Sequence, residues 1–109
     1  MPPDDETLSR ALAHHQSGRL AEAEQLYRAI LTVDPNHAGA LHLLGVLAMQ
    51  SGRPADATAL IRQAIARNPA ESIFHSNLGE ACRALGQIDE AIANFRRAIE
   101  LAPNFPAAH

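Results

Sequence analysis

The sequence repeats itself every 34 residues, and this period constrains the fold more than any other feature. Written as rows 4–37, 38–71 and 72–105, the chain needs no gap. Four columns hold the same residue type in every row: Gly18, Gly52 and Gly86; Ala23, Ala57 and Ala91; Arg28, Arg62 and Arg96; Pro35, Pro69 and Pro103. Such a period is typical of stacked structural repeats.

Each row is predicted to form two helices separated by its glycine. In the second row they are expected at 38–51 and from Pro54 to about Arg67. Gly52 suits the left-handed C-cap of a helix, and proline suits a helix's first position. Pro69 then prevents continuation. The other rows give helices at 4–17, 20–33, 72–85 and 88–101.

Composition favours an all-α fold. Hydrophobic residues make up 47% of the chain but aromatic residues only 4%, and alanine and leucine, strong helix formers, dominate. One hairpin cannot bury its apolar face, so hairpins must stack. We therefore predict a single all-α domain over residues 1–109, a solenoid of three helix-turn-helix repeats with six helices. Residues 106–109 either start a fourth repeat or mark where a longer protein was cut.

Small residues indicate close helix crossings. Gly45 and Gly79 lie within predicted helices, where glycine costs about 1 kcal/mol relative to alanine. We expect a partner helix to cross closely there, with Ala57 and Ala91 on the other side of the contact. Cys82 occupies a core column and is predicted to be a small buried hydrophobe.

Charge and cysteine usage exclude several functions. The net charge is −3, so the chain lacks the basic field that nucleic acid binding requires. A lone cysteine excludes an internal disulfide and a cysteine-based zinc site. No apolar run is long enough to span a membrane, and the acidic start does not resemble a signal peptide. We expect a cytoplasmic protein.

No catalytic or metal site emerges from the motifs. None of the six histidines pairs at i,i+4, and no His-Glu-x-x-His occurs. No nucleophile, base and orienting group can be argued together. We therefore predict no enzyme activity, no metal and no cofactor.

These columns resemble the tetratricopeptide repeat family. The third row matches its pattern at Leu78-Gly79, Gly86, Ala91, Phe95, Ala98 and Pro103. It departs from the pattern at His75 and Cys82, where larger apolar or aromatic residues are common. The resemblance implies a right-handed superhelix of antiparallel helix pairs, whose first helices line a concave groove that binds a peptide or protein segment.

In the family, residues one and two turns into each first helix face this groove. The predicted binding residues are Leu8, Leu12, His15, His42, Leu43, Val46, Met49, Ser76, Asn77, Glu80 and Arg83. The groove would be apolar toward the N-terminus, where it could receive an apolar peptide or helix, and polar toward the C-terminus. Burial against neighbouring helices, or self-association, explains the leucines equally well. The basic residues with which one subset of the family grips a peptide carboxylate are missing.

Two functions remain open. The first is an adaptor that binds a protein segment in its groove. The second is the substrate-recognition arm of a larger bacterial glycosyltransferase-like enzyme with its catalytic domain downstream. Segments 41–47 and 76–81 resemble the N-terminal arrays of bacterial proteins similar to O-linked N-acetylglucosamine transferases, in which Asn77 corresponds to a frequent groove asparagine. Arginine as the only strongly basic residue, with abundant alanine, is typical of GC-rich bacteria.

The two ends of the array differ. Thr7, Arg10 and His14 occupy columns that are mostly apolar in the other rows, which is typical of a polar N-terminal cap. At the other end Ile92, Phe95 and Ile99 would lack a covering helix. Exposed apolar ridges of this kind predict self-association.

Overall fold

The computed structural model describes residues 5–102, and within that range the chain forms six α-helices and no strand. The helices are α1 (Asp5–Gln16), α2 (Leu20–Val33), α3 (Ala38–Gln50), α4 (Pro54–Arg67), α5 (Ser72–Ala84) and α6 (Ile88–Leu101). The second helix of every row has its predicted bounds. The first helices end one residue early, because Ser51 and Leu85 act as C-caps outside the last helical turn. The predicted fourth repeat lies outside the described residues.

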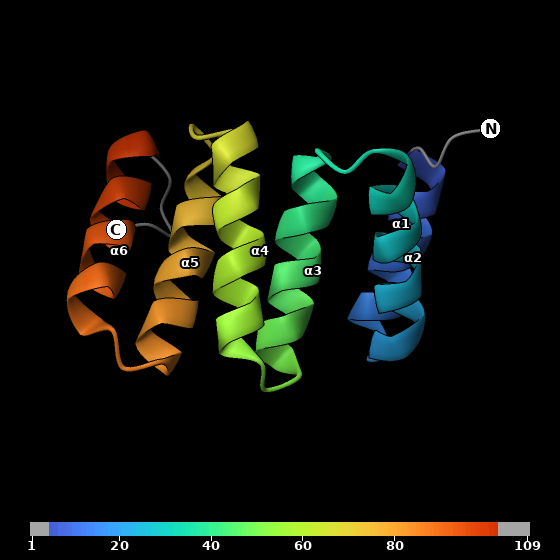
Figure 1. Ribbon diagram of the computed structural model, residues 1–109, viewed down its shortest axis with the longest axis horizontal. Coiled ribbons are helices and arrows are strands. Elements are labelled where there is room, and N and C mark those ends of the chain that lie inside the picture. Colours follow the sequence, from blue (N-terminus) through green and yellow to red (C-terminus); the bar gives the residue numbers. More distant parts are fainter. Residues whose placement is uncertain (1–4, 103–109) are drawn as a thin grey trace.

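The helices pair as hairpins, α1 with α2, α3 with α4 and α5 with α6. The hairpins stand side by side in chain order along the long axis of the molecule (Figure 1). Successive hairpins touch because α2 packs against α3 and α4 against α5, and the first helices α3 and α5 also meet. The molecule measures 40 × 27 × 23 Å, as expected for a line of stacked units.

A glycine with positive φ ends the first helix of every hairpin. The φ angles are 80°, 76° and 78° at Gly18, Gly52 and Gly86, in the left-handed region that side chains disfavour. After Gly52 the chain turns back on its own helix: the Arg53 amide donates to the Ala48 carbonyl at 2.8 Å, and the Gly52 amide to that of Met49 at 3.1 Å. This pair of bonds is a Schellman C-cap and confirms the predicted role of the glycine column.

The predicted close crossings exist, and Ala57 borders the first of them as predicted, but the nearest atoms in both crossings belong to a larger residue. A Cβ atom on Gly45 would lie 2.7 Å from Cγ1 of Ile61 and 3.3 Å from the carbonyl oxygen of Ala57. On Gly79 it would lie 2.7 Å from the Phe95 ring, which supplies all three nearest atoms there. Ile61 and Phe95, each one turn after the shared-column alanine of its row, therefore fill the crossings. The alanines Ala57 and Ala91 are small enough to let the helices approach.

The core runs through the junctions between hairpins. One cluster of buried residues joins α3, α4, α5 and α6, and a second joins α1, α2 and α3. Cys82 is fully buried, as predicted; burial, followed by the nearby Glu90 carboxylate, raises the pKa of its thiol. Tyr27 is also fully buried, which raises its pKa to about 12. Within residues 5–102, no helix combines the length and apolarity needed to cross a bilayer.

Candidate functional site

Helix α3 carries apolar residues on every side and contains no Asp, Glu, Lys or Arg. Such a helix is normally enclosed by its neighbours. Seven of its 13 residues are indeed buried. Leu43, Val46 and Met49, however, remain only half-buried. They form an apolar face of the central helix that the surrounding helices leave accessible.

This face continues onto the two flanking first helices. Leu8 and Leu12 on α1 and Asn77 and Glu80 on α5 are also half-buried. We call the accessible set the first-helix surface, and it consists of Leu8, Leu12, His15, Leu43, Val46, Met49, Ser76, Asn77, Glu80 and Arg83. The surface is apolar across α1 and α3 and polar on α5.

His42 lies beneath this surface rather than on it, because only 7% of the residue is exposed. Its ring centroid is 4.6 Å from that of Phe74, and its Nε2 is 2.7 Å from Nδ2 of Asn77. Burial lowers the pKa of His42 to about 4, so the ring is neutral at pH 7. Nε2 therefore accepts the hydrogen bond from the Asn77 amide. This bond from a buried residue orients the Asn77 side chain.

A second histidine makes a similar contact between the first two repeats. Nε2 of His15 lies 2.5 Å from Oε1 of Gln50, and its Nδ1 lies 2.9 Å from the Tyr27 hydroxyl. A carboxamide oxygen only accepts, so Nε2 carries a proton, and in the neutral ring Nδ1 then accepts from the hydroxyl. Gln50 is not among the residues predicted from the sequence. It stands seven residues after Leu43, and this spacing on the same helix face is the signal that could have found it.

The polar end of the first-helix surface carries no net charge. Arg83 on α5 forms an ion pair with Glu80, three residues earlier; the Arg83 side chain is largely exposed and that of Glu80 about half-exposed. The two charges therefore neutralise each other locally. Among the described residues, no three His, Cys, Asp or Glu side chains gather as metal ligands would.

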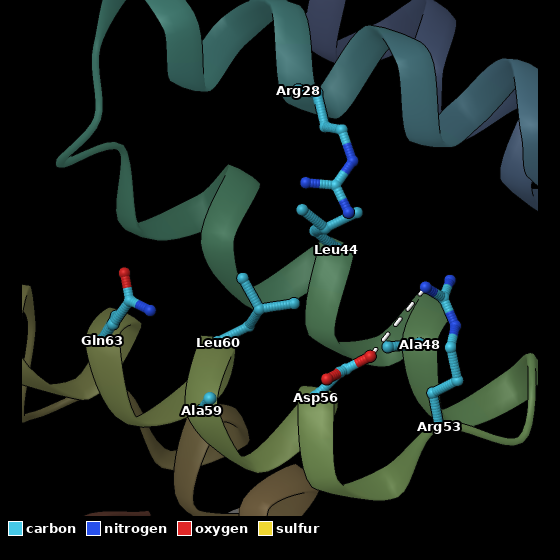
Figure 2. A pocket seen from close by; sticks show the side chains of 8 residues that line it. All are labelled: Arg28, Leu44, Ala48, Arg53, Asp56, Ala59, Leu60 and Gln63. Atoms are coloured by element: carbon cyan, nitrogen blue, oxygen red, sulfur yellow. Dashed lines mark ion pairs between the residues drawn. The ribbon is translucent and has the colours of Figure 1, made fainter.

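A hollow of about 270 Å³ lies on the other side of α3, between α2 and α4 (Figure 2). Leu44 and Ala48 contribute to it, and they point roughly 150° around α3 from Leu43 and Val46. The full lining is Arg28, Leu44, Ala48, Arg53, Asp56, Ala59, Leu60 and Gln63. Both arginines already have acidic partners, Glu24 for Arg28 at 2.9 Å and Glu24 and Asp56 for Arg53. No residue of this hollow was predicted as a binding residue.

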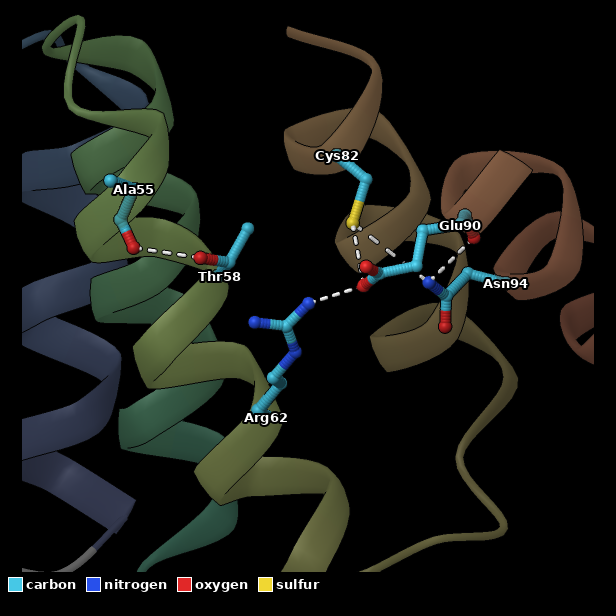
Figure 3. A network of polar contacts seen from close by, with 6 residues as sticks. All are labelled: Ala55, Thr58, Arg62, Cys82, Glu90 and Asn94. Carbon is cyan, nitrogen blue, oxygen red and sulfur yellow. Dashed lines mark hydrogen bonds and ion pairs between the residues drawn. The ribbon is translucent and has the colours of Figure 1, made fainter. Parts of the chain in front are cut away.

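The polar contacts beside the hollow do not follow the repeat. At the second junction Arg62 of α4 forms an ion pair with Glu90 of α6, and the Glu90 carboxylate also lies 3.7 Å from Sγ of Cys82 (Figure 3). The corresponding residues at the first junction are Arg28 and Asp56, and no ion pair is found between them in the described structure. Asp56 has one methylene fewer, and Arg28 turns to Glu24 instead.

Stacked helical hairpins with an accessible apolar face on their first helices define a helical-repeat scaffold, a class of proteins that bind partners along an extended surface. Family models described as tetratricopeptide repeat match residues 42–106 and 4–47, and the first alone spans more than half of the chain. The chain belongs to the tetratricopeptide repeat family.

Individual relatives agree with this assignment. The human tetratricopeptide repeat protein 7A is 35% identical over 89 residues, which cover 82% of this chain and 10% of that protein. A mutant O-GlcNAc transferase from Thermobaculum terrenum superposes with a TM-score of 0.92 at 35% identity, covering 96% of this chain and 20% of the transferase. The first repeat domain of Spaghetti, solved bound to an HSP90 peptide, superposes with a TM-score of 0.88 at 24% identity. The match covers 94% of this chain and 81% of the Spaghetti chain. This chain thus spans a tenth to a fifth of the first two relatives.

Proposed function

We propose that this chain is a protein-interaction scaffold, without catalysis of its own, that binds a peptide or protein segment on its first-helix surface. The observation that carries the proposal is the uncovered apolar face of α3, formed by Leu43, Val46 and Met49. Contiguous apolar patches on soluble proteins commonly mark interaction sites. The peptide-bound Spaghetti domain supports the proposal, because a protein of the same fold holds a peptide.

Selection from a phage-displayed library of random 12-residue peptides tests this proposal. We expect enrichment on the wild-type chain and its loss on Val46→Asp, which places a charge at the centre of the apolar face. The matched control is Ala66→Asp, at an exposed position of α4. Circular dichroism confirms that both variants fold. Failure of the wild type to enrich peptides, or equal enrichment on Val46→Asp, refutes the proposal.

A second candidate is the substrate-recognition arm of a larger glycosyltransferase-like enzyme. The observation that favours it is the similarity to the Thermobaculum terrenum enzyme, which extends over almost the whole of this chain. The proposal predicts a reading frame that continues past His109 into an α/β catalytic domain. In such a protein Val46→Asp should lower kcat/KM for a protein substrate and spare that for a minimal acceptor peptide. A frame that stops shortly after His109 excludes this candidate.

We also propose that the last helix mediates self-association with a second copy of the chain. Ile92 and Ile99 on α6 are 43% and 42% exposed, and Phe95 is half-buried. The preceding second helices, α2 and α4, pack against α3 and α5. A light-scattering mass that rises with protein concentration, and falls to one chain in Ile92→Glu, is the expected result. A monomeric wild type at all concentrations contradicts it.

A further inference from the structure

Helix α6, at one end of the row of helices in Figure 1, differs from α2 and α4 on the face that those two helices cover. Ile92 stands in the column that holds Glu24 in α2 and Thr58 in α4. Thr58 is buried and Glu24 half-buried, whereas Ile92 is exposed. The covered helices are thus polar in this column and the uncovered one is apolar. The isoleucine therefore favours a covering surface unlike the first helices of this array.

The exposed isoleucines of α6 form a stripe along the helix. Ile88, Ile92 and Ile99 are four and seven residues apart, so their side chains point within about 40° of one another around the helix axis. The stripe extends over about 17 Å, at 1.5 Å of rise per residue. A contiguous exposed apolar patch of this kind is typical of an interaction surface.

Two opposite charges lie on one side of this stripe. Asp89 and Arg96 are both exposed and are seven residues apart, so they point to the same side of α6. Glu90, Arg97 and Glu100 of the same helix already belong to ion pairs. Asp89 and Arg96, in contrast, form no ion pair with any described residue. They are therefore available to a charged partner that covers the stripe.

The stripe and the two charges are complementary to themselves when two copies of α6 pack antiparallel. In a two-fold antiparallel pair, each side of one helix faces the same side of the other, and the two chains run in opposite directions. With position 93 at the two-fold axis, Asp89 of each copy lies within about 1.5 Å of the level of Arg96 in the second copy. The same register brings Ile88 to the level of Ile99 in the second copy and the two Ile92 side chains to the axis.

A parallel pair does not offer this match. Asp89 would then lie level with Asp89 of the second copy, and Arg96 with Arg96. Opposite charges would meet only after a shift of seven residues, or about 10 Å, which separates most of the two stripes. The charge pattern therefore selects the antiparallel orientation.

We propose that two copies of this chain form a two-fold symmetric dimer in which their α6 helices pack antiparallel and Asp89 of each copy pairs with Arg96 of the other. This inference rests on the self-association proposed above and specifies its geometry. A two-fold interface uses the same surface on both copies, so the assembly closes at two chains. The contact is one helix of about 21 Å long, so we expect a reversible dimer rather than a permanent one.

Sedimentation equilibrium of the 109-residue chain at several protein concentrations measures the Kd of this dimer. Reversal of one charge, in Asp89→Arg or in Arg96→Asp, converts both ion pairs of the symmetric dimer into repulsions. We expect each variant to raise the Kd about tenfold. An equimolar mixture of the two variants should regain a Kd close to that of the wild type, because every charge in the mixed dimer then faces an opposite one.

The matched controls are Glu22→Arg and Arg10→Asp, which make the same changes of net charge at exposed positions of α2 and α1. Glu22 lies in the first turn of its helix, as Asp89 does in α6. Both controls should dimerise like the wild type. Circular dichroism checks that every variant folds.

The outcomes separate this geometry from self-association through α6. A monomeric wild type, or a dimer that Ile92→Glu leaves intact, overturns both. Dimerisation that is lost in Ile92→Glu but unchanged by both charge reversals overturns the antiparallel pairing and leaves α6 as the contact. A mixture that dimerises no better than either variant alone, or equal weakening in the controls, overturns the pairing as well. A mass that continues to grow beyond two chains overturns the closed dimer.

Discussion

Acidification should destabilise this protein through one buried side chain, His42. Its pKa is about 4 in the folded chain and 6.5 when exposed, because burial disfavours the charged ring. Below pH 6.5 His42 becomes protonated in the unfolded chain but stays neutral in the folded chain. The free energy of unfolding therefore decreases as the pH is lowered. The loss is complete once the pH has passed through the folded pKa. The two pKa values of His42 differ by about 2.5, so the free energy of unfolding should be about 3 kcal/mol lower at pH 4 than at pH 7.

Urea denaturation at pH 7 and pH 4 measures this effect in the wild type and in His42→Gln. Glutamine keeps a hydrogen-bond acceptor for Asn77 but does not titrate in this range. The other titrating groups are common to both proteins and cancel in the comparison. Relative to His42→Gln, the wild type should lose about 3 kcal/mol of unfolding free energy between the two pH values. Parallel losses in both proteins would refute a buried neutral histidine.

Three further predictions concern packing, surface charge and the thiol. Gly45→Ala should lower the unfolding free energy by about 1 kcal/mol, since crowding of buried Ile61 outweighs the gain in helix propensity; a higher melting temperature would contradict this. Arg62→Ala should cost less than about 1 kcal/mol in urea denaturation because the ion pair with Glu90 is half-exposed, and 1 M salt should shrink the difference. Cys82 should react with Ellman's reagent slowly in native buffer and rapidly in urea, because the folded chain encloses it; fast native labelling would show that α5 and α6 separate.

The helices could be predicted almost to the residue because their boundaries depend on local chemistry. Gly52 ends α3 in a left-handed cap, and Pro54 begins α4 two residues later. These effects act within one turn of the chain and are visible in any single row. The 34-residue period then predicts the stacking, since every row offers the same apolar columns to its neighbour.

The contacts of individual polar side chains could not be predicted in this way. His42 lies under the first-helix surface in contact with Phe74, a residue from the next repeat, and no pattern within its own row indicates this contact. The pairing of His15 with Gln50 depends on the one-column offset between neighbouring first helices, which no single row reveals. Likewise, Arg28 and Arg62 share a column, yet Arg28 pairs with Glu24 on its own helix and Arg62 pairs with Glu90 on α6.

The turn glycines and the crossing glycines tolerate change in opposite ways. A Cβ on Gly52 would meet no atom within 4 Å, so only backbone conformation, and not space, requires glycine there. A loop lengthened at this point keeps the phase of every helix. One residue inserted in α3 before Gly45 would instead rotate the remainder of the helix by about 100° and move the glycine away from Ile61. In this array, therefore, added length should be tolerated at the turns, where it leaves the first-helix surface unaltered.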